Sequence, residues 1–395
     1  KNRSSLCFFL LTQFIISKYY IVGDKMKKLK ICVYAISKNE EKFVDRWYNS
    51  MKEADQVYVL DTGSTDNTVE KLKKLGAIVK TEIITPWRFD IARNKSLEMV
   101  PSDYDICVCT DLDEILLPGW RKELEAIWDE NTDNLAYNYN WALDENDNPL
   151  VNFYIEQIHS RDNFKWTHPV HEVLTKIKPN DKRKKYTNNI TLNHYPDKNK
   201  SRSSYLPLLE LSVKEDPLDD RNMHYLGREY MYYGKWNEAI DTLIKHLNLK
   251  TATWKDERCA SMRFIARSYI NLNRIEEAKM WLDKAIKEAP HLRDPIIEKA
   301  LLEYSLNNLA ETKKLCLKAL KITSHEKTYI NEIFSWDETV YDLLSICYFS
   351  EHKYKLALKN INKAIKINPN NERIKKNKIL IVEYMKNQSK NNFNQ

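Results

Sequence analysis

Between residues 29 and 120, apolar runs of strand length alternate with segments in which apolar residues recur at helical spacing. The runs are KICVYAIS (30–37), QVYVLD (56–61) and YDICVC (104–109), and the more amphipathic AIVKTEII (77–84) is predicted to be an edge strand. Nearly continuous apolar strands joined by helical crossovers are typical of a parallel sheet covered on both faces. We therefore predict an α/β domain in this part of the chain.

Polar residues follow each of the three apolar runs. In such sheets ligands bind beyond the carboxyl ends of the strands, so we expect these residues to converge on one rim. They are Ser37, Asn39 and Glu40, then the segment DTGSTD (61–66), then Asp111, Asp113 and Glu114.

The segment Asp111-Leu112-Asp113-Glu114 places three carboxylates within four positions. A hard divalent cation prefers carboxylate oxygens and keeps positions open for the oxygens of a phosphate. The alternative is that Asp113 and Glu114 only cap the next helix, because Pro118 and GWRKELEAIW follow closely. The segment alone leaves both interpretations open.

Beyond residue 135 the alternating pattern around DENDNP (144–149) is typical of a β-hairpin, and short strands and loops are expected as far as residue 195. From about residue 205 the spacing is helical throughout. Here a small residue stands three positions before a Tyr, and an Ala follows nine later. The sets are Gly227/Tyr230/Ala239, Ala266/Tyr269/Ala278 and Ser345/Tyr348/Ala357, with a degenerate copy at 296–322 that keeps Ala319.

This pattern resembles the tetratricopeptide repeat, in which small residues let paired helices pack closely. Such arrays bind a protein or peptide in a concave groove, or dimerise. We therefore expect an all-α repeat domain at residues 205–385, with a disordered tail at 386–395.

Two segments of the first half resemble family 2 glycosyltransferases. VYVLDTGSTDNTVEKL (57–72) is similar to the second-strand signature of that family. WRFDIARNKSLEMVPSDYDICVCTDLDE (87–114) is similar to its Phe…Ala-Arg-Asn…Asp-x-Asp-Glu segment, in matching order and spacing. KWTHPVHEVL (165–174) resembles the His-Glu motif of the subgroup that carries tetratricopeptide repeats, which includes enzymes that glycosylate bacteriocin peptides.

The resemblance implies a Rossmann-like nucleotide-sugar-binding fold, called GT-A, at residues 26–204. It also implies an inverting sugar transfer assisted by Mn²⁺ or Mg²⁺. A UDP-hexose is the favoured donor. The nucleobase is left open, because Thr62 stands where many relatives have a second Asp that touches uracil. The implied site residues are Ser37, Asn39 and Glu40 in the nucleotide pocket, Asp61 on the base or ribose, Arg93 and Asn94 facing the nucleotide, and Asp111 and Asp113 on ribose, donor sugar and metal.

A single displacement needs one general base to activate the acceptor hydroxyl or thiol. Our candidate is Glu172, with Asp113 as the other catalytic carboxylate and Asp144 or Asp147 of the hairpin as rivals. His171 is a candidate further metal ligand. For His168 and His194, structural and functional roles stay equally open.

Composition restricts the remaining possibilities. The net charge of +7 is modest for 395 residues, and no aromatic residues interleave with the basic run at 176–185, so nucleic acid is not an expected partner. Seven cysteines without a CxxC pair favour a reduced, cytoplasmic protein. The apolar run within residues 1–25 is too short to span a bilayer, and we interpret these residues as an upstream extension before Met26.

The preferred interpretation is a metal-dependent inverting hexosyltransferase acting on a peptide, protein or cell-surface glycan. Its helical repeats would recruit a polypeptide acceptor or form a homodimer. One alternative is an interaction scaffold whose sugar-nucleotide domain is catalytically idle. The other is a nucleotidyltransferase, but this chain lacks the Gly-rich first loop expected of that class of enzyme.

Overall fold

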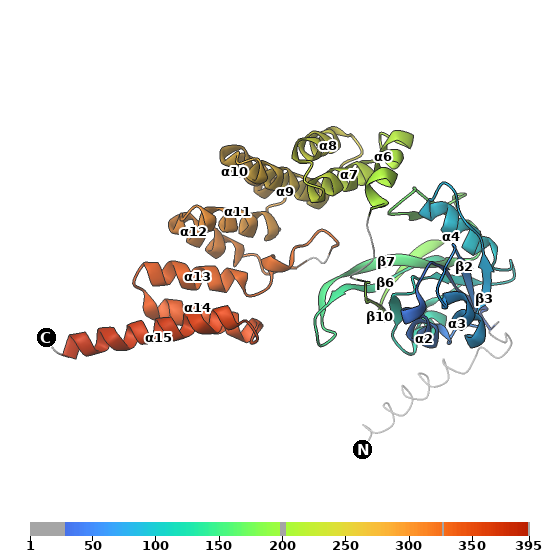
Figure 1. The fold of residues 1–395 in the computed structure, drawn as a ribbon, viewed down its shortest axis with the longest axis horizontal. Helices are drawn as coiled ribbons and strands as arrows, with labels where there is room; N and C mark the ends of the chain where they lie inside the picture. Colours follow the sequence, from blue (N-terminus) through green and yellow to red (C-terminus); the bar gives the residue numbers. More distant parts are fainter. Residues whose placement is uncertain (1–27, 198–202, 326–327, 394–395) are drawn as a thin grey trace, which may run out of the picture.

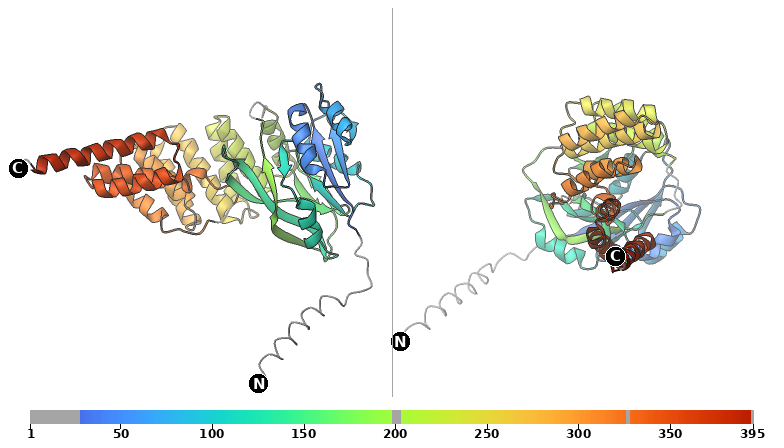
Figure 2. Two further views of the ribbon diagram at one scale, coloured as in Figure 1. Left: turned by 90° about the horizontal axis from the view of Figure 1, so that it is seen from below. Right: turned by 90° about the vertical axis from the view of Figure 1, so that its left-hand side faces the viewer.

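The computed structural model describes residues 28–197, 203–325 and 328–393. A sheet-based α/β unit comes first, and an array of helices then curves away from it toward the C-terminus (Figure 1; Figure 2). The extension expected at residues 1–25 lies outside the described residues.

The α/β unit is built on one eight-stranded sheet with the order β3-β2-β1-β4-β7-β6-β10-β5. Strands β1 to β4 are parallel, and β3 lies at the edge, as the sequence predicted. The strands are β1 (Ile31–Ser37), β2 (Gln56–Asp61), β3 (Ile78–Thr81), β4 (Ile106–Cys109), β5 (Glu114–Leu116), β6 (Thr132–Leu143), β7 (Pro149–Ser160) and β10 (Arg183–His194).

Helices cover both faces of the parallel strands because their side chains alternate between two apolar cores. On one face Val33 of β1 packs with Trp47 of α2 (Glu41–Met51) and with α3 (Thr68–Leu75) and α5 (Trp120–Ile127). On the other face Tyr34 of β1 packs with Leu97 of α4 (Phe89–Glu98) and with Trp166. Cys107 and Cys109 belong to this second core, where they serve as packing.

The predicted hairpin is present, and it also widens the sheet, which the sequence did not indicate. Strand β7 pairs antiparallel with both β6 and β4, so the complete sheet is mixed rather than parallel. A separate ribbon of β8 (Phe164–Thr167) and β9 (Val173–Lys176) carries the His-Glu motif on the connection between its strands.

The second part consists of antiparallel helix pairs, as the repeat pattern predicted. The alanines of that pattern are fully buried, Ala239, Ala278 and Ala357 among them. The helices are α6 (Tyr205–Glu215), α7 (Asp220–Tyr232), α8 (Trp236–Asn248), α9 (Lys255–Asn271), α10 (Ile275–Glu288), α11 (Asp294–Ser305), α12 (Leu309–Ala319), α13 (Thr339–Ser350), α14 (Tyr354–Ile367) and α15 (Glu372–Phe393), with a short 3₁₀ turn at Ile333–Ser335.

The expectation of a disordered tail from residue 386 is wrong as far as Phe393, because α15 continues to that residue. The last two residues lie outside the described chain. Among the described residues, no helix combines the length and the apolar character needed to cross a bilayer. The six described cysteines are buried and carry free thiols.

The two parts meet at a junction with its own apolar core. Val170 packs there with Leu209 of α6 and Tyr225 of α7. The ring of Phe89 at the start of α4 lies 6.1 Å from that of Tyr205, and Arg88 donates a 2.6 Å hydrogen bond to Glu215. The repeat array therefore packs directly against the loops that precede α4 and β9.

Gly227 shows why the repeat needs a small residue. A Cβ at this position would lie 2.5 Å from Cγ of the buried Leu243 on the paired helix. We predict that Gly227→Ala lowers the free energy of unfolding by about 1–2 kcal/mol, since overpacking outweighs the better helix propensity of alanine. Chemical denaturation measures this free energy. The control is Asn237→Ala, which changes an exposed residue on the surface of α8. Unchanged or increased stability would contradict the close packing.

Candidate active site at the carboxyl rim of the sheet

The carboxyl ends of β1, β2 and β4 lie side by side, as predicted. Ser37 is opposite Asp61 in the register of β1 and β2, and Tyr34 is opposite Cys109 in that of β1 and β4. The three polar segments of the sequence therefore share one rim of the sheet.

Asp61 organises the turn after β2. Its fully buried carboxylate accepts hydrogen bonds from the hydroxyls of Ser37 and Ser64 and from the backbone N–H groups of Gly63 and Ser64, at 2.5 to 3.1 Å. Gly63 has a φ of +106°, which a residue with a Cβ rarely adopts. This carboxylate fixes the loop that the rim presents.

Thr62 and Asn39 tie the ends of β1 and β2 together. The Thr62 hydroxyl donates to the carbonyl of Ser37 at 3.0 Å, and the Thr62 residue is buried. The Asn39 side-chain carbonyl accepts from the N–H of Thr65 at 2.7 Å. Glu40 is also buried, and its N–H donates to Thr68. The residues expected to line a nucleotide pocket thus form one hydrogen-bonded loop pair.

Arg93 of α4 is the centre of the site. Its guanidinium is buried, yet it binds two carboxylates: Nη2 lies 3.0 Å from Asp111, and Nε donates to Glu172. It also lies over the ring of Trp166, 5.2 Å from the centroid. Burial opposes the charge, but the two carboxylates outweigh it and raise the pKa of Arg93 well above its ordinary value.

The carboxylates after β4 lie in three different environments. The Asp111 side chain is 41% exposed and that of Asp113 14%, whereas Glu114 is buried and its carboxylate accepts from the N–H of Asp111 at 2.8 Å. Burial, and next the charge of Asp111, raise the pKa of Glu114 to about 8. Glu114 therefore holds its proton more strongly than an exposed carboxyl group does, while Asp111 remains open to solvent.

The helix-capping interpretation of this segment is wrong. Glu114 begins β5, which pairs with β10, and helix α5 starts only at Trp120 with Gly119 as its N-cap residue. Asp113 and Glu114 are held by the sheet instead of the helix.

His194 is the residue whose role the sequence left open. Its Nε2 lies 3.5 Å from Asp113, and its Nδ1 is 3.0 Å from the carbonyl of Trp141. Burial would lower its pKa, but the hydrogen bond and charge of Asp113 outweigh burial and raise it to about 8. The imidazolium thus faces the acidic segment and partly balances its charge.

The structure does not bring His171 into a metal-ligand group with Asp111 and Asp113 among the described residues. Its backbone is in the left-handed region, with φ of +51°, and its ring stacks on Tyr225 of α7 at 4.2 Å. His168 likewise faces α7, 3.0 Å from the amide of Asn222. The predicted ligand His171 is therefore a junction residue, because its turn packs against the repeats.

Asn94 also differs from expectation. Its amide makes two 2.8 Å hydrogen bonds with the backbone N–H and carbonyl of Trp166. Instead of facing a nucleotide, this side chain fixes β8 against α4, where Arg93 and Glu172 meet.

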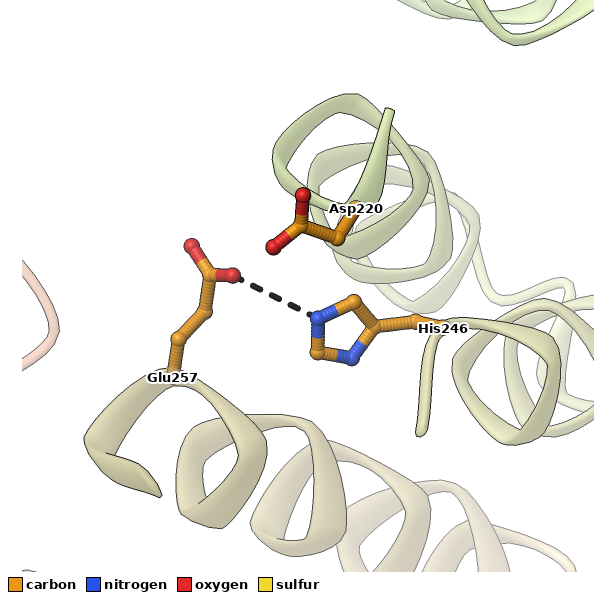
Figure 3. Close-up of side chains that lie close together, drawn as sticks. All are labelled: Asp220, His246 and Glu257. Atoms are coloured by element: carbon orange, nitrogen blue, oxygen red, sulfur yellow. Dashed lines mark ion pairs between the residues drawn. The ribbon is translucent and has the colours of Figure 1, made fainter. Parts of the chain in front are cut away.

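The described residues contain one group of three whose spacing suits a metal ion, and it lies in the helical array (Figure 3). Asp220, His246 and Glu257 come from α7, α8 and α9, with ligand atoms within 4.8 Å of one another. His246 Nε2 is 3.3 Å from Glu257, which also accepts from Tyr329. Burial opposes this charge, but hydrogen bonds, foremost that from His246, lower the pKa of Glu257 to about 2. No sequence motif signals this group, because tertiary packing alone assembles it.

Comparison with known proteins identifies the domain that carries the rim. Residues 32–193 match the sequence profile of the family described as Glycosyl transferase family 2. Residues 32–193 are a family 2 glycosyltransferase domain. Residues 264–292 and 338–371 match the tetratricopeptide repeat, so the glycosyltransferase domain is followed by such repeats.

Curated relatives resemble only part of the chain. An uncharacterized glycosyltransferase of Rickettsia typhi is 38% identical over 112 residues, which are 27% of this chain and 37% of the relative. One of Rickettsia conorii is 38% identical over 111 residues, with 27% and 38% covered. The chain thus spans little more than a third of the length of these relatives.

Two solved structures each resemble less than half of the chain. A structure of MamA is 18% identical, with a TM-score of 0.35, and the match covers 42% of this chain and 88% of that one. The thermophilic repeat protein TTC0263 of Thermus thermophilus is also 18% identical, with a TM-score of 0.32 and coverages of 46% and 90%.

The ion pairs of Arg93 make the glycosyltransferase domain depend on one guanidinium. We predict that Arg93→Met lowers the free energy of unfolding by about 3–5 kcal/mol, because a buried carboxylate loses its cation. The double variant Arg93→Met/Glu172→Gln should recover part of this loss, since no charge is then left at position 172. Urea denaturation measures both effects.

Lys30→Met is the control, because it removes a cation from the exposed pair with Asp103 at the opposite end of the sheet. Its effect should be much smaller. Equal losses for the single and double variants at position 93 would contradict an electrostatic origin.

Proposed function

We propose that this protein is a metal-dependent inverting glycosyltransferase that moves a hexose from a nucleotide-sugar, a UDP-hexose in the first instance, to a peptide, protein or cell-surface glycan. The observation that carries the proposal is the gathering of Asp111, Asp113 and Arg93 beside the Asp61 turn, on the rim of a family 2 domain. Parallel α/β sheets bind their ligands at this rim.

The nucleotide and the metal are assigned to neighbouring parts of this rim. In the proposal Ser37, Asn39, Glu40 and Asp61 shape the nucleotide pocket through their loop pair. Asp111 and Asp113 hold Mn²⁺ or Mg²⁺, and their hard oxygen donors and partial exposure fit such a cation. When bound, the cation neutralises the negative charge that develops on the diphosphate as it leaves.

The protein's own residues supply the remaining chemistry. Glu172 is the proposed general base, and its ion pair with Arg93 fixes the direction of the carboxylate. It takes the proton of the acceptor hydroxyl while that oxygen bonds to the anomeric carbon. The bond from this carbon to the diphosphate oxygen breaks, so one displacement inverts the configuration at the anomeric carbon. Asp144 and Asp147 remain rivals for the base, although Asp144 accepts the backbone N–H groups that shape the hairpin turn.

The helical repeats are proposed to recruit the acceptor, and dimerisation through them is the second role that fits such arrays. A cytoplasmic location is proposed on the six buried free thiols of the described residues, which suit a reducing compartment. The scaffold alternative requires an idle rim, and the intact carboxylates at 111 and 113 favour the enzyme.

Calorimetric titration of UDP into the protein, with and without Mn²⁺, tests the donor site. We predict binding that depends on Mn²⁺ and is weakened roughly tenfold or more in Asp113→Asn, because a direct ligand is lost. Asp103→Asn is the matched control, since this exposed carboxylate lies at the opposite end of the sheet.

If UDP does not bind, GDP and CDP are titrated next, because Thr62 leaves the identity of the nucleobase open. If none of the three nucleotides binds, the proposed function is wrong and the interaction scaffold is favoured.

A further inference from the structure

A cleft of about 730 Å³ separates the β6–β7 hairpin from the last repeats. Residues 144–146 and 149–152 line one side. The other side is lined by His325, Thr328 and residues 331–333, 336–338 and 367–370. Across it, the Asn370 amide donates a 3.1 Å hydrogen bond to Glu145, so the two walls are in direct contact at one point. The catalytic domain and the repeat array thus form this space together.

The cleft is acidic. Its described lining residues include no Lys or Arg, but they include five carboxylates: Asp144, Glu145, Glu332, Asp337 and Glu338. Glu332 is balanced by ion pairs with Arg263 and Arg267, at 3.1 and 2.6 Å. Two of the others, Glu145 and Glu338, receive hydrogen bonds from neutral asparagine amides. The described lining residues therefore leave a negative field in the cleft.

Large apolar side chains are exposed in the same cleft. Leu150, Ile333 and Ile367 are 48%, 43% and 46% exposed, and the Trp336 ring also lines the space. Apolar side chains gathered at the surface and rimmed by polar groups mark an interaction site. An occupant needs both cationic groups and apolar groups.

Strand β6 connects the cleft to the rim. The Trp141 carbonyl contacts His194, which in turn faces Asp113. Asp144 follows three residues later, and an extended chain rises roughly 3.3 Å per residue, so the cleft begins roughly 10 Å from that contact. Only a few residues of an extended ligand are needed to join the two places.

We propose that this cleft holds a polypeptide segment in which lysine or arginine side chains alternate with apolar ones, and that it presents the acceptor to the rim. The inference rests on the proposed function, which it deepens by naming the acceptor class. The negative field opposes nucleic acids and phosphorylated ligands, and neutral glycans gain nothing from it. The outer edge of β7 between Pro149 and Ile155 pairs with no described strand, so it offers backbone groups that an extended peptide matches.

The test measures fluorescence anisotropy of a labelled 12-residue peptide in which lysine alternates with leucine or alanine, without any donor. A peptide with glutamate in place of lysine is the comparison. The variant is Glu145→Gln/Glu338→Gln in the full chain, which keeps side-chain size. The control is Glu238→Gln/Glu276→Gln, which removes two charges from exposed positions outside the lining.

We expect the lysine peptide to bind more tightly than the glutamate peptide, and to lose roughly three- to tenfold in the cleft variant but not in the control. Equal binding of the two peptides, equal effects of the two variants, or displacement by a neutral oligosaccharide would overturn the proposal. Nucleotide titration of the same preparations separates the two claims. Loss of nucleotide binding with the peptide preference intact would overturn the proposed function and leave the cleft as a peptide site.

Discussion

The buried guanidinium of Arg93 is the interaction on which the site depends. It binds Asp111 at the end of β4 and Glu172 on the β8–β9 ribbon, and it packs on Trp166 of that ribbon. The turn that carries Glu172 also carries His171, which stacks on Tyr225 of the repeats. One cation, through the turn of Glu172 and His171, therefore connects the carboxyl rim of the sheet, the ribbon and the helical array. Because a buried charge is costly without its partners, these three parts hold one another in place.

Charge balance at the rim bears on the divalent cation that we propose there. The segment after β4 contains three carboxylates, but Glu114 is buried with a pKa of about 8, and Arg93 and His194 each face one of the other two. Arg93 also pairs with Glu172, so the carboxylates that face these two cations exceed them in number. In the proposed function, a divalent cation offsets this negative charge and that of the diphosphate.

The sequence predicted local features well and tertiary contacts poorly. The strands, their polar ends and the repeat helices follow from hydrophobic periodicity, which each segment carries by itself. Glu114 was misread as a possible helix cap because β5 has only three residues and exists through its pairing with β10, nearly 80 positions later. His171 was misplaced because its turn packs on α7, and the group of Asp220, His246 and Glu257 had no signal at all.

We propose that the rim, and not the helical array, binds the metal with the nucleotide. The most direct test is anomalous X-ray scattering from crystals grown with UDP and Mn²⁺. It separates the proposed ligands Asp111 and Asp113 from Asp220, His246 and Glu257, the one group of three with metal-ligand spacing among the described residues. We predict a manganese peak beside Asp111 and Asp113, with the diphosphate next to it. A peak only at Asp220, His246 and Glu257, with none at the rim, would contradict the assignment of the donor site.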